Sequence, residues 1–153
     1  MIIIECEQNS PEWHAARCGR VTASRVCDIV RQTKSGVSKM RETYLGEIVA
    51  ERLSGTQPEG FSTSAMQWGK DTEDQARAVY EFMNDVTASR VGFVVHGTIQ
   101  MAGASPDSLI GEDGGLEIKC PNSSTHIATL LGSEIEPDYI KQMQPPKQED
   151  DGQ

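Results

Sequence analysis

Aromatic side chains are scarce in this sequence of 153 residues, and long hydrophobic runs and an excess of positive charge are missing. Phe, Trp and Tyr make up only 5% of it, so we expect a core of aliphatic and small side chains. No apolar run approaches the roughly 20 residues needed to cross a bilayer, and residues 1–5 lack the basic start of a signal peptide. We therefore expect one cytoplasmic domain with no membrane partner.

Paired cysteines are also missing. The four cysteines contain no C-x-x-C pair, and the three histidines do not lie beside them at zinc-like spacing. Free, mostly buried thiols are the simpler interpretation, and neither a disulfide scaffold nor a structural zinc site is expected.

The net charge of −9 comes from 23 acidic and 14 basic residues, which argues against a generally basic nucleic-acid-binding protein. Residues 17–41 differ from the rest, because they hold seven of the 14 basic residues and a single acid, Asp28. Their local charge is therefore +6. Such a cluster is either a solvated face or a local anion site within an acidic protein.

Capping residues and hydrophobic spacing predict a largely helical chain. The first helix begins after the capping hydroxyl of Ser10 and ends near Arg17. A second helix is expected to be capped within Thr22-Ala23-Ser24. Further helices are expected over 39–53, 65–84, 123–131 and 137–144. The third helix carries an apolar stripe that predicts its buried face, formed by Leu45, Ile48, Val49 and Leu53.

Two segments favour β-structure. Residues 91–101 fit one strand or a hairpin broken near Gly97, and residues 116–120 fit a short strand. Alternation along the second segment places Glu117 and Lys119 on the same face.

Glu73 lies on a helical stripe that is otherwise apolar and includes Ala76, Tyr80 and Met83. Burying a carboxylate is costly unless another group pairs with it. Glu73 therefore either reaches back to solvent from the end of the stripe or faces a functional site.

The most informative pattern is a Pro-Asp pair ending at Asp107, nine further residues, and then Glu117-Ile118-Lys119. A hairpin between the two parts would bring two carboxylates and a lysine together. Two carboxylates attract a hard cation such as Mg²⁺, which polarises a phosphate and activates water. The lysine can orient that water or stabilise the phosphate. The alternative is a Pro-Asp turn beside a solvated Glu/Lys face on an edge strand.

Further short stretches accompany this pattern. In chain order they are Trp13-His14-Ala15-Ala16-Arg17, Val21-Thr22-Ala23-Ser24, Trp68-Gly69-Lys70 with Glu73, Ser105-Pro106-Asp107, Leu116-Glu117-Ile118-Lys119-Cys120-Pro121 and, more weakly, Tyr139-Ile140-Lys141-Gln142-Met143-Gln144. Together they span residues 12–144. On these residues the chain resembles the lambda exonuclease family, also called YqaJ-type viral recombinases, within the PD-(D/E)XK nuclease superfamily.

The resemblance implies an α/β (α+β) fold of the restriction-endonuclease type, with a central mixed sheet flanked by helices. It implies that Asp107 and Glu117, with the main-chain carbonyl of Ile118, bind Mg²⁺, for which Mn²⁺ can substitute. Lys119 resembles the catalytic lysine of the family. Glu73 resembles the helical acid that supports a second metal ion or the water.

Three other residues take roles from the same resemblance. Gln142 resembles the glutamine that helps to order the nucleophile, and Arg17 and Ser24 resemble the residues that hold the 5′-phosphate of a DNA end. The expected helix start at Ser24 agrees with this role, because free N–H groups there favour a phosphate. The other bases of residues 17–41 are interpreted as contacts to the phosphate backbone. Trp13 and Trp68 are interpreted as packing residues.

The family implies one-strand digestion of duplex DNA from the 5′ end, a ring-shaped homotrimer and a single-strand annealing protein as partner. Relatives continue past the helix of residues 137–144 into further strands, whereas this sequence continues into a Pro-Pro and acidic segment. We therefore expect a nuclease domain over residues 1–144 that lacks its C-terminal strands, and a disordered tail over residues 145–153. An unpaired sheet edge would weaken the trimer and processive digestion.

The leading hypothesis is thus a phage or prophage exonuclease that acts 5′→3′ in the bacterial cytoplasm. A second is a protein that binds DNA ends without cleaving them. A third is a related endonuclease, which would nick closed circular DNA. A fourth is an interaction protein with no affinity for nucleic acid.

Overall fold

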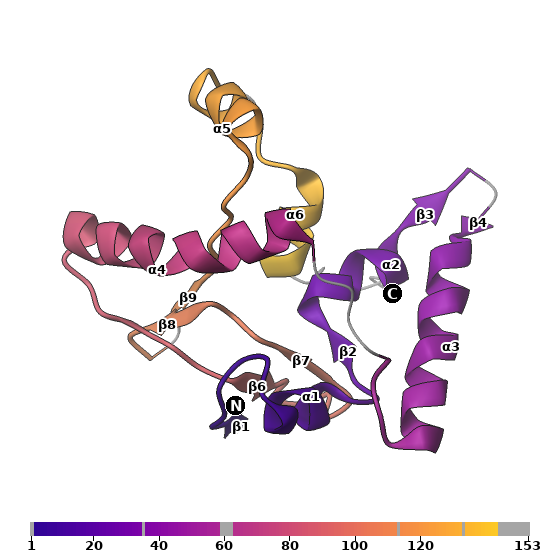
Figure 1. Ribbon diagram of the computed structural model, residues 1–153. Coiled ribbons are helices and arrows are strands. Elements are labelled where there is room, and N and C mark those ends of the chain that lie inside the picture. The colour runs from indigo at the N-terminus through magenta and orange to yellow at the C-terminus, as the bar shows by residue number, and fades with distance from the viewer. Residues whose placement is uncertain (1, 35, 59–62, 113, 133, 144–153) are drawn as a thin grey trace, which may run out of the picture.

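The structure, a computed structural model, describes residues 2–34, 36–58, 63–112, 114–132 and 134–143. Its centre is a sheet with the strand order β1-β6-β7-β2 (Figure 1). The sheet is mixed, because β1–β6 and β6–β7 are antiparallel whereas β2–β7 is parallel. The strands are β1 (Ile2–Ile4), β2 (Val21–Thr22), β6 (Phe93–Val95) and β7 (Ala102–Ala104). The predicted α/β fold with a central mixed sheet flanked by helices is confirmed.

The small core lies where α1 (Pro11–Arg17) packs on β6. Phe93 is fully buried there with Ala16 and Val95, and Trp13 packs against them. Burying a phenylalanine of this kind stabilises the fold by about 1.5–3 kcal/mol. Gly103 on β7 makes room for the Phe93 ring, because a Cβ at this position would collide with it.

A second sheet has the order β5-β8-β9, with antiparallel pairs. Its strands are β5 (Ala88–Ser89), β8 (Ser108–Ile110) and β9 (Gly114–Leu116). Ser108 pairs with Leu116, so the residue before β8, Asp107, and the residue after β9, Glu117, lie at the same end of the hairpin. A separate hairpin joins β3 (Gln32–Thr33) to β4 (Gly36–Val37).

The strand predicted over residues 116–120 is wrong beyond Leu116, where β9 ends. The physical reason is a side chain: the Asp107 carboxylate accepts the Ile118 N–H at 2.5 Å, and residues 117–120 belong to no strand. The other β-segment forms a hairpin, as one of its two interpretations predicts, but only its first strand, β6, lies within residues 91–101. The second strand, β7, begins at Ala102, beyond the predicted range.

Most predicted helices are confirmed. Ser10 accepts the Trp13 N–H and caps α1. The long helices and the last two follow the expected ranges: α3 (Lys39–Ser54), α4 (Ser64–Asn84), α5 (Ser123–Leu130) and α6 (Pro137–Met143). The helix expected at Thr22 is instead a 3-10 turn, η1 (Ala23–Arg25), followed by the short α2 (Val26–Val30). Thr22 provides no side-chain cap, because its hydroxyl faces those of Tyr44 and Ser24.

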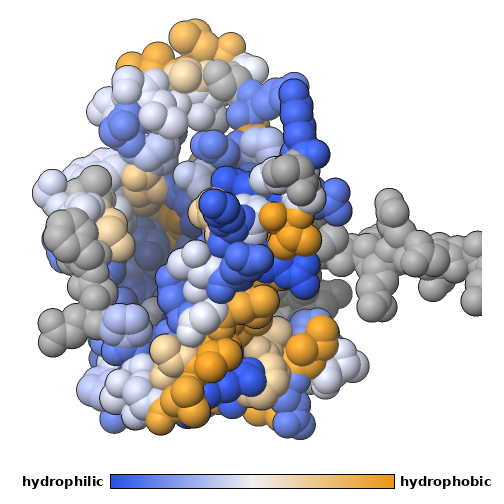
Figure 2. Space-filling model, turned by 90° about the vertical axis from the view of Figure 1, so that its right-hand side faces the viewer, coloured by the Kyte–Doolittle hydropathy of each residue, from blue (hydrophilic) through white to orange (hydrophobic). Residues whose placement is uncertain are grey.

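The expected buried stripe of α3 is wrong except at Ile48. Leu45, Val49 and Leu53 are 42%, 54% and 85% exposed, whereas Ile48 is 5% exposed. Tyr44 points inward instead, because its hydroxyl accepts the Thr22 N–H at 3.0 Å. Figure 2 shows hydrophobic side chains gathered on the side where α3 lies and at the end formed by α5.

The stripe of α4 is wrong in the same way. Tyr80 is 36% exposed and Met83 is 75% exposed, and among the described side chains of this helix the buried one is Arg77. The four cysteines are free but only half-buried, so the expected burial of their thiols is only partly met. No helix among the described residues is long and apolar enough to cross a membrane. The predicted tail, residues 145–153, and the domain limit at residue 144 lie outside the described residues.

Candidate active site

The β8–β9 hairpin brings the two predicted metal-ligand carboxylates together. Asp107 lies at its end just before β8, and Glu117 lies opposite, just after β9. The bond from the Ile118 N–H fixes the Asp107 carboxylate toward the second strand. This part of the site therefore follows from a sequence pattern that requires only a short antiparallel pair.

Glu117 connects the hairpin to α6. Its Oε1 accepts hydrogen bonds from Lys119 Nζ and Gln142 Nε2, both at 2.6 Å. Lys119 Nζ also lies 5.1 Å from the centre of the Tyr139 ring on α6, within range of a cation–π interaction. The structure thus brings Gln142 to the predicted Glu117–Lys119 pair across 25 residues of sequence.

Glu73 approaches Asp107 from α4 on a different side. Its carboxylate pairs with Arg77, and Arg77 Nη2 in turn lies 3.4 Å from the main-chain oxygen of Asp107. Glu73 and Asp107 line a hollow that does not include Glu117, Lys119 or Gln142. The structure therefore places Glu73 beside Asp107, joined to it through an arginine that the sequence pattern did not single out.

A cavity of about 420 Å³ brings three of the catalytic candidates together with the end-binding candidates, whereas Asp107 and Glu73 line the other hollow. Glu117, Lys119 and Gln142 line one part of it. Arg17 from the end of α1 and Ser24 from η1 line another. Because Ser24 lies in a three-residue turn, it can offer a phosphate its own hydroxyl but not the start of a long helix.

Arg17 is held in place by two residues that sequence reasoning did not assign to the site. Its guanidinium stacks over the Trp13 ring, 4.1 Å from the ring centre, and Nη1 donates to Ser105 Oγ at 3.3 Å. Trp13 Nε1 donates to the same hydroxyl at 2.8 Å. Trp13 therefore packs against the core, as expected, and also orients Arg17. The signal for Ser105 was its position directly before the Pro-Asp pair.

The guanidinium of Arg17 pairs with no carboxylate among the described residues. Burial lowers its pKa, and the more distant Tyr44 and Glu51 oppose that effect. A half-buried guanidinium without a counter-ion is costly unless an anion joins it. Its fork of donors suits a phosphate.

Asp107 has a carboxyl pKa raised to about 6. Burial is the main cause, and the negative charges of Glu117 and Glu73 add to it. The Ile118 N–H and Lys119 act in the opposite direction. A cation bound between the carboxylates would relieve this repulsion.

The donor set fits a divalent cation held by one or two carboxylates and completed by water and substrate phosphate, which is how Mg²⁺ commonly binds. Asp107 and Glu117 supply two carboxylates. Among the residues that the structure describes, no group of three or more His, Cys, Asp or Glu side chains is arranged to hold a metal ion. The metal-binding roles of Asp107, Glu117, Glu73 and the Ile118 carbonyl therefore all stay predictions.

We expect binding of a divalent cation to weaken as the pH falls through about 6, because a proton then occupies the Asp107 carboxyl. The sign follows from the raised pKa: the carboxylate is protonated below that value and free to bind above it. Calorimetric titration with Mn²⁺ from about pH 5 to about pH 8 measures the effect. Equal affinity at both ends of this range would contradict it.

Comparison with known proteins finds a matching family and matching solved structures. The family described as YqaJ-like viral recombinase domain matches residues 12–145. A solved structure of an alkaline exonuclease, LHK-Exo from Laribacter hongkongensis, matches this chain with 45% sequence identity and a TM-score of 0.76. The match covers 87% of this chain and 64% of that chain. LHK-Exo in complex with dAMP is 46% identical with a TM-score of 0.77, covering 88% and 65%.

The chain thus spans a little under two thirds of the length of these solved relatives. No curated protein sequence was found to match it. The structural match supports the predicted PD-(D/E)XK nuclease fold.

Proposed function

The chain belongs to the family of YqaJ-like viral recombinase domains, and on this premise we propose that it is a metal-dependent deoxyribonuclease that digests duplex DNA from 5′-phosphorylated ends. The proposed direction is 5′→3′, the proposed ion is Mg²⁺ with Mn²⁺ as a substitute, and the proposed nuclease domain is residues 1–144. The setting is the cytoplasm of a bacterial host during phage-type recombination. A single-strand annealing protein is a further proposed partner, and a homotrimer is the proposed assembly.

The observation that carries this proposal is the shared cavity. Arg17 and Ser24 lie at one part of it, and Glu117, Lys119 and Gln142 lie at another. A terminal phosphate bound by the Arg17 guanidinium would leave the following phosphodiester near the Glu117 carboxylate. The relative's complex with dAMP supports the same conclusion, because a deoxynucleoside monophosphate is the kind of product that an exonuclease releases.

Each residue of the proposed site has a defined task. A bound Mg²⁺ would be held by Asp107 and Glu117 and would polarise the scissile phosphate and activate water. Lys119, as a compact cation beside Glu117, stabilises charge on the phosphate or takes part in moving the proton of the water. Gln142 orients Glu117 through its amide and leaves its carbonyl oxygen to accept from the water.

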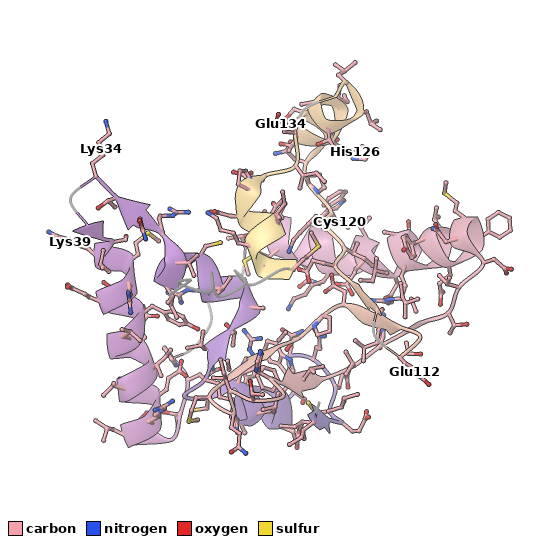
Figure 3. All side chains as sticks on the ribbon, turned by 180° about the vertical axis from the view of Figure 1, so that it is seen from behind. Lys34, Lys39, Glu112, Cys120, His126 and Glu134 are labelled. Carbon is pink, nitrogen blue, oxygen red and sulfur yellow. The ribbon has the colours of Figure 1, made fainter. Side chains whose placement is uncertain are left out.

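The basic segment divides into two groups in the structure. Arg25 and Arg31 are paired with carboxylates of Asp28, Glu47 and Asp138. Lys34 and Lys39 are exposed, and neither forms an ion pair among the described residues. Figure 3 shows both side chains near the β3–β4 hairpin, pointing outward. We assign the expected contacts to the DNA backbone mainly to these lysines and exposed Arg41.

Arg17→Met is expected to remove the preference for a 5′-phosphate over a 5′-hydroxyl end. Truncating one partner of a hydrogen-bonded charge pair costs about 2–5 kcal/mol, or at least about 30-fold in affinity. End-labelled duplexes with and without the phosphate, digested with Mg²⁺ or with chelator, measure the preference.

Two variants serve as controls for Arg17. Arg17→Lys keeps the charge but loses the fork and the stacked plane, so the preference should fall only in part. Arg20→Met should leave the preference unchanged, because Arg20 donates to the main-chain oxygens of Gln100 and Ala16. Nicking of closed circular DNA would favour the endonuclease hypothesis, and end binding without product would favour the non-cleaving one. The absence of any phosphate-dependent affinity would favour the interaction protein.

A further inference from the structure

Arg77 is a buried cation at the back of the candidate active site. It is 7% exposed, and its guanidinium contacts four groups. Nε donates to Ser108 Oγ at 2.8 Å, Nη1 donates to Asp74 Oδ1 at 2.7 Å, and Nη2 contacts both the Glu73 carboxylate and, at 3.4 Å, the main-chain oxygen of Asp107. One side chain of α4 thus reaches both predicted acids of this region and the first residue of β8.

The connection to Asp107 is made twice. Besides the direct contact from Nη2, the Ser108 hydroxyl, which accepts from Arg77, donates to the same Asp107 oxygen at 2.6 Å. Ser108 is fully buried, so this path excludes water. The main chain that carries the Asp107 carboxylate is therefore fixed to α4 through a planar group with rigid donor directions.

A buried charge with this many partners needs a reason. Replacing such a network by apolar side chains is often neutral or stabilising, so stability alone is weak evidence for its role. Here the partners are a predicted metal ligand, Asp107, and a predicted acid of the same site, Glu73. Side chains that orient metal ligands commonly change metal affinity or activity by about 10- to 100-fold when they are replaced.

We propose that Arg77 is a positioning residue that holds the Glu73 carboxylate and the Asp107 main chain in the relative placement needed to bind a divalent cation. The inference rests on the proposed nuclease function and goes beyond it in naming a residue that sets metal affinity without touching the metal or the DNA. Its contribution is geometric: the fork of donors matters more than the positive charge, which by itself would repel a cation.

Arg77→Lys separates geometry from charge. A lysine keeps the charge but cannot make the four contacts at once, so we expect Mn²⁺ affinity, measured by calorimetry or electron paramagnetic resonance without DNA, to fall by about 10-fold or more. The Mg²⁺ concentration for half-maximal cleavage should rise by the same factor, while KM for DNA stays unchanged. If charge alone mattered, Arg77→Lys would bind Mn²⁺ like the wild type, and that result would overturn the proposal.

Arg90→Lys is the matched control. Arg90 also pairs with Asp74, but its side chain is 64% exposed and it contacts neither Glu73 nor Asp107 in the described contacts. Its Mn²⁺ affinity should equal that of the wild type. An equal loss in both variants would mean that only the Asp74 contact matters and would also overturn the proposal.

A double-mutant cycle tests whether Arg77 acts through Glu73. In a Glu73→Gln background, Arg77→Lys should lower Mn²⁺ affinity by a clearly smaller factor than in the wild type. The full factor in both backgrounds would overturn the part of the proposal that concerns Glu73 and leave only the contacts to the Asp107 main chain. Thermal unfolding of each variant shows whether a general loss of structure causes the effect.

If Arg77→Lys fails to fold, Ser108→Ala takes its place, because it removes only the hydroxyl that links Arg77 to Asp107. Mn²⁺ affinity should then fall in the same direction by a smaller factor, and no change would count against the proposal. A wild-type protein that binds Mn²⁺ but cleaves no DNA would instead contradict the proposed function, so the two failures are distinct.

Discussion

Asp107→Asn is expected to lower the rate of DNA cleavage by about 10³-fold or more. A metal ion supplies several kcal/mol of charge stabilisation in the transition state, and each 1.36 kcal/mol changes the rate about tenfold. The variant keeps the fold, because an amide oxygen can accept the Ile118 N–H as the carboxylate does. Single-turnover digestion of a 5′-phosphorylated duplex at saturating Mg²⁺ measures the effect.

The same variant should be more stable than the wild type above pH 6. The pKa of Asp107 is raised to about 6 by burial, so its ionised form opposes folding, and this penalty grows as the pH rises from the unfolded value of 3.8 through 6. Asn carries no such penalty. The difference in Tm between the two proteins should therefore be largest above pH 6 and should vanish below about pH 4.

Asp71→Asn provides the comparison for both measurements. Asp71 lies exposed on α4 and accepts from Gln67, and it lines neither of the hollows around Asp107. The cleavage rate of Asp71→Asn and the dependence of its Tm on pH should match those of the wild type. An Asp107→Asn protein that is folded and fully active would exclude Asp107 as a metal ligand.

The sequence was sufficient to predict the parts of the site that depend on short-range geometry. A Pro-Asp pair, a glycine-containing turn and Glu-x-Lys need only the antiparallel β8–β9 hairpin to bring Asp107 and Glu117 together. Helices with clear caps, such as α1 at Ser10, were also predictable, because capping is a local interaction. The resemblance supplied the long-range part, the approach of Gln142 to Glu117.

The errors have a common physical origin in tertiary packing. Hydrophobic spacing predicted that Leu45, Val49 and Leu53 face the core, but the side chain that packs inward is Tyr44, held by the Thr22 N–H. On α4, Tyr80 and Met83 of the predicted apolar stripe are exposed, and a charged side chain outside that stripe, Arg77, is buried instead. No local pattern shows that a partner such as Ser108, 31 positions away, will satisfy that charge. Polar networks of this kind become visible only once the elements are packed together.

Lys119→Met is expected to lower kcat by about 10²- to 10⁴-fold, the range for losing a group that assists proton transfer in the transition state. Lys119 Nζ lies 2.6 Å from Glu117 Oε1 and faces the Tyr139 ring, so the ammonium is held at the edge of the cavity with Glu117 and Gln142. Mn²⁺ affinity should not fall, because removing a cation beside Glu117 leaves that carboxylate more available. Metal titration and single-turnover cleavage, measured on the same preparation, separate the two steps.

Lys141→Met is the control for the loss of a cation near the cavity. Lys141 lies on α6 next to Gln142, but its ammonium pairs with Asp138 at 3.2 Å, and it does not line the cavity. A rate close to that of the wild type is expected for this variant. Lys119→Arg should remain slow, since a planar guanidinium cannot occupy the position of a compact ammonium beside Glu117. Full cleavage by Lys119→Met would remove Lys119 from the mechanism, whereas a matching loss in Lys141→Met would show that the effect is only the local charge.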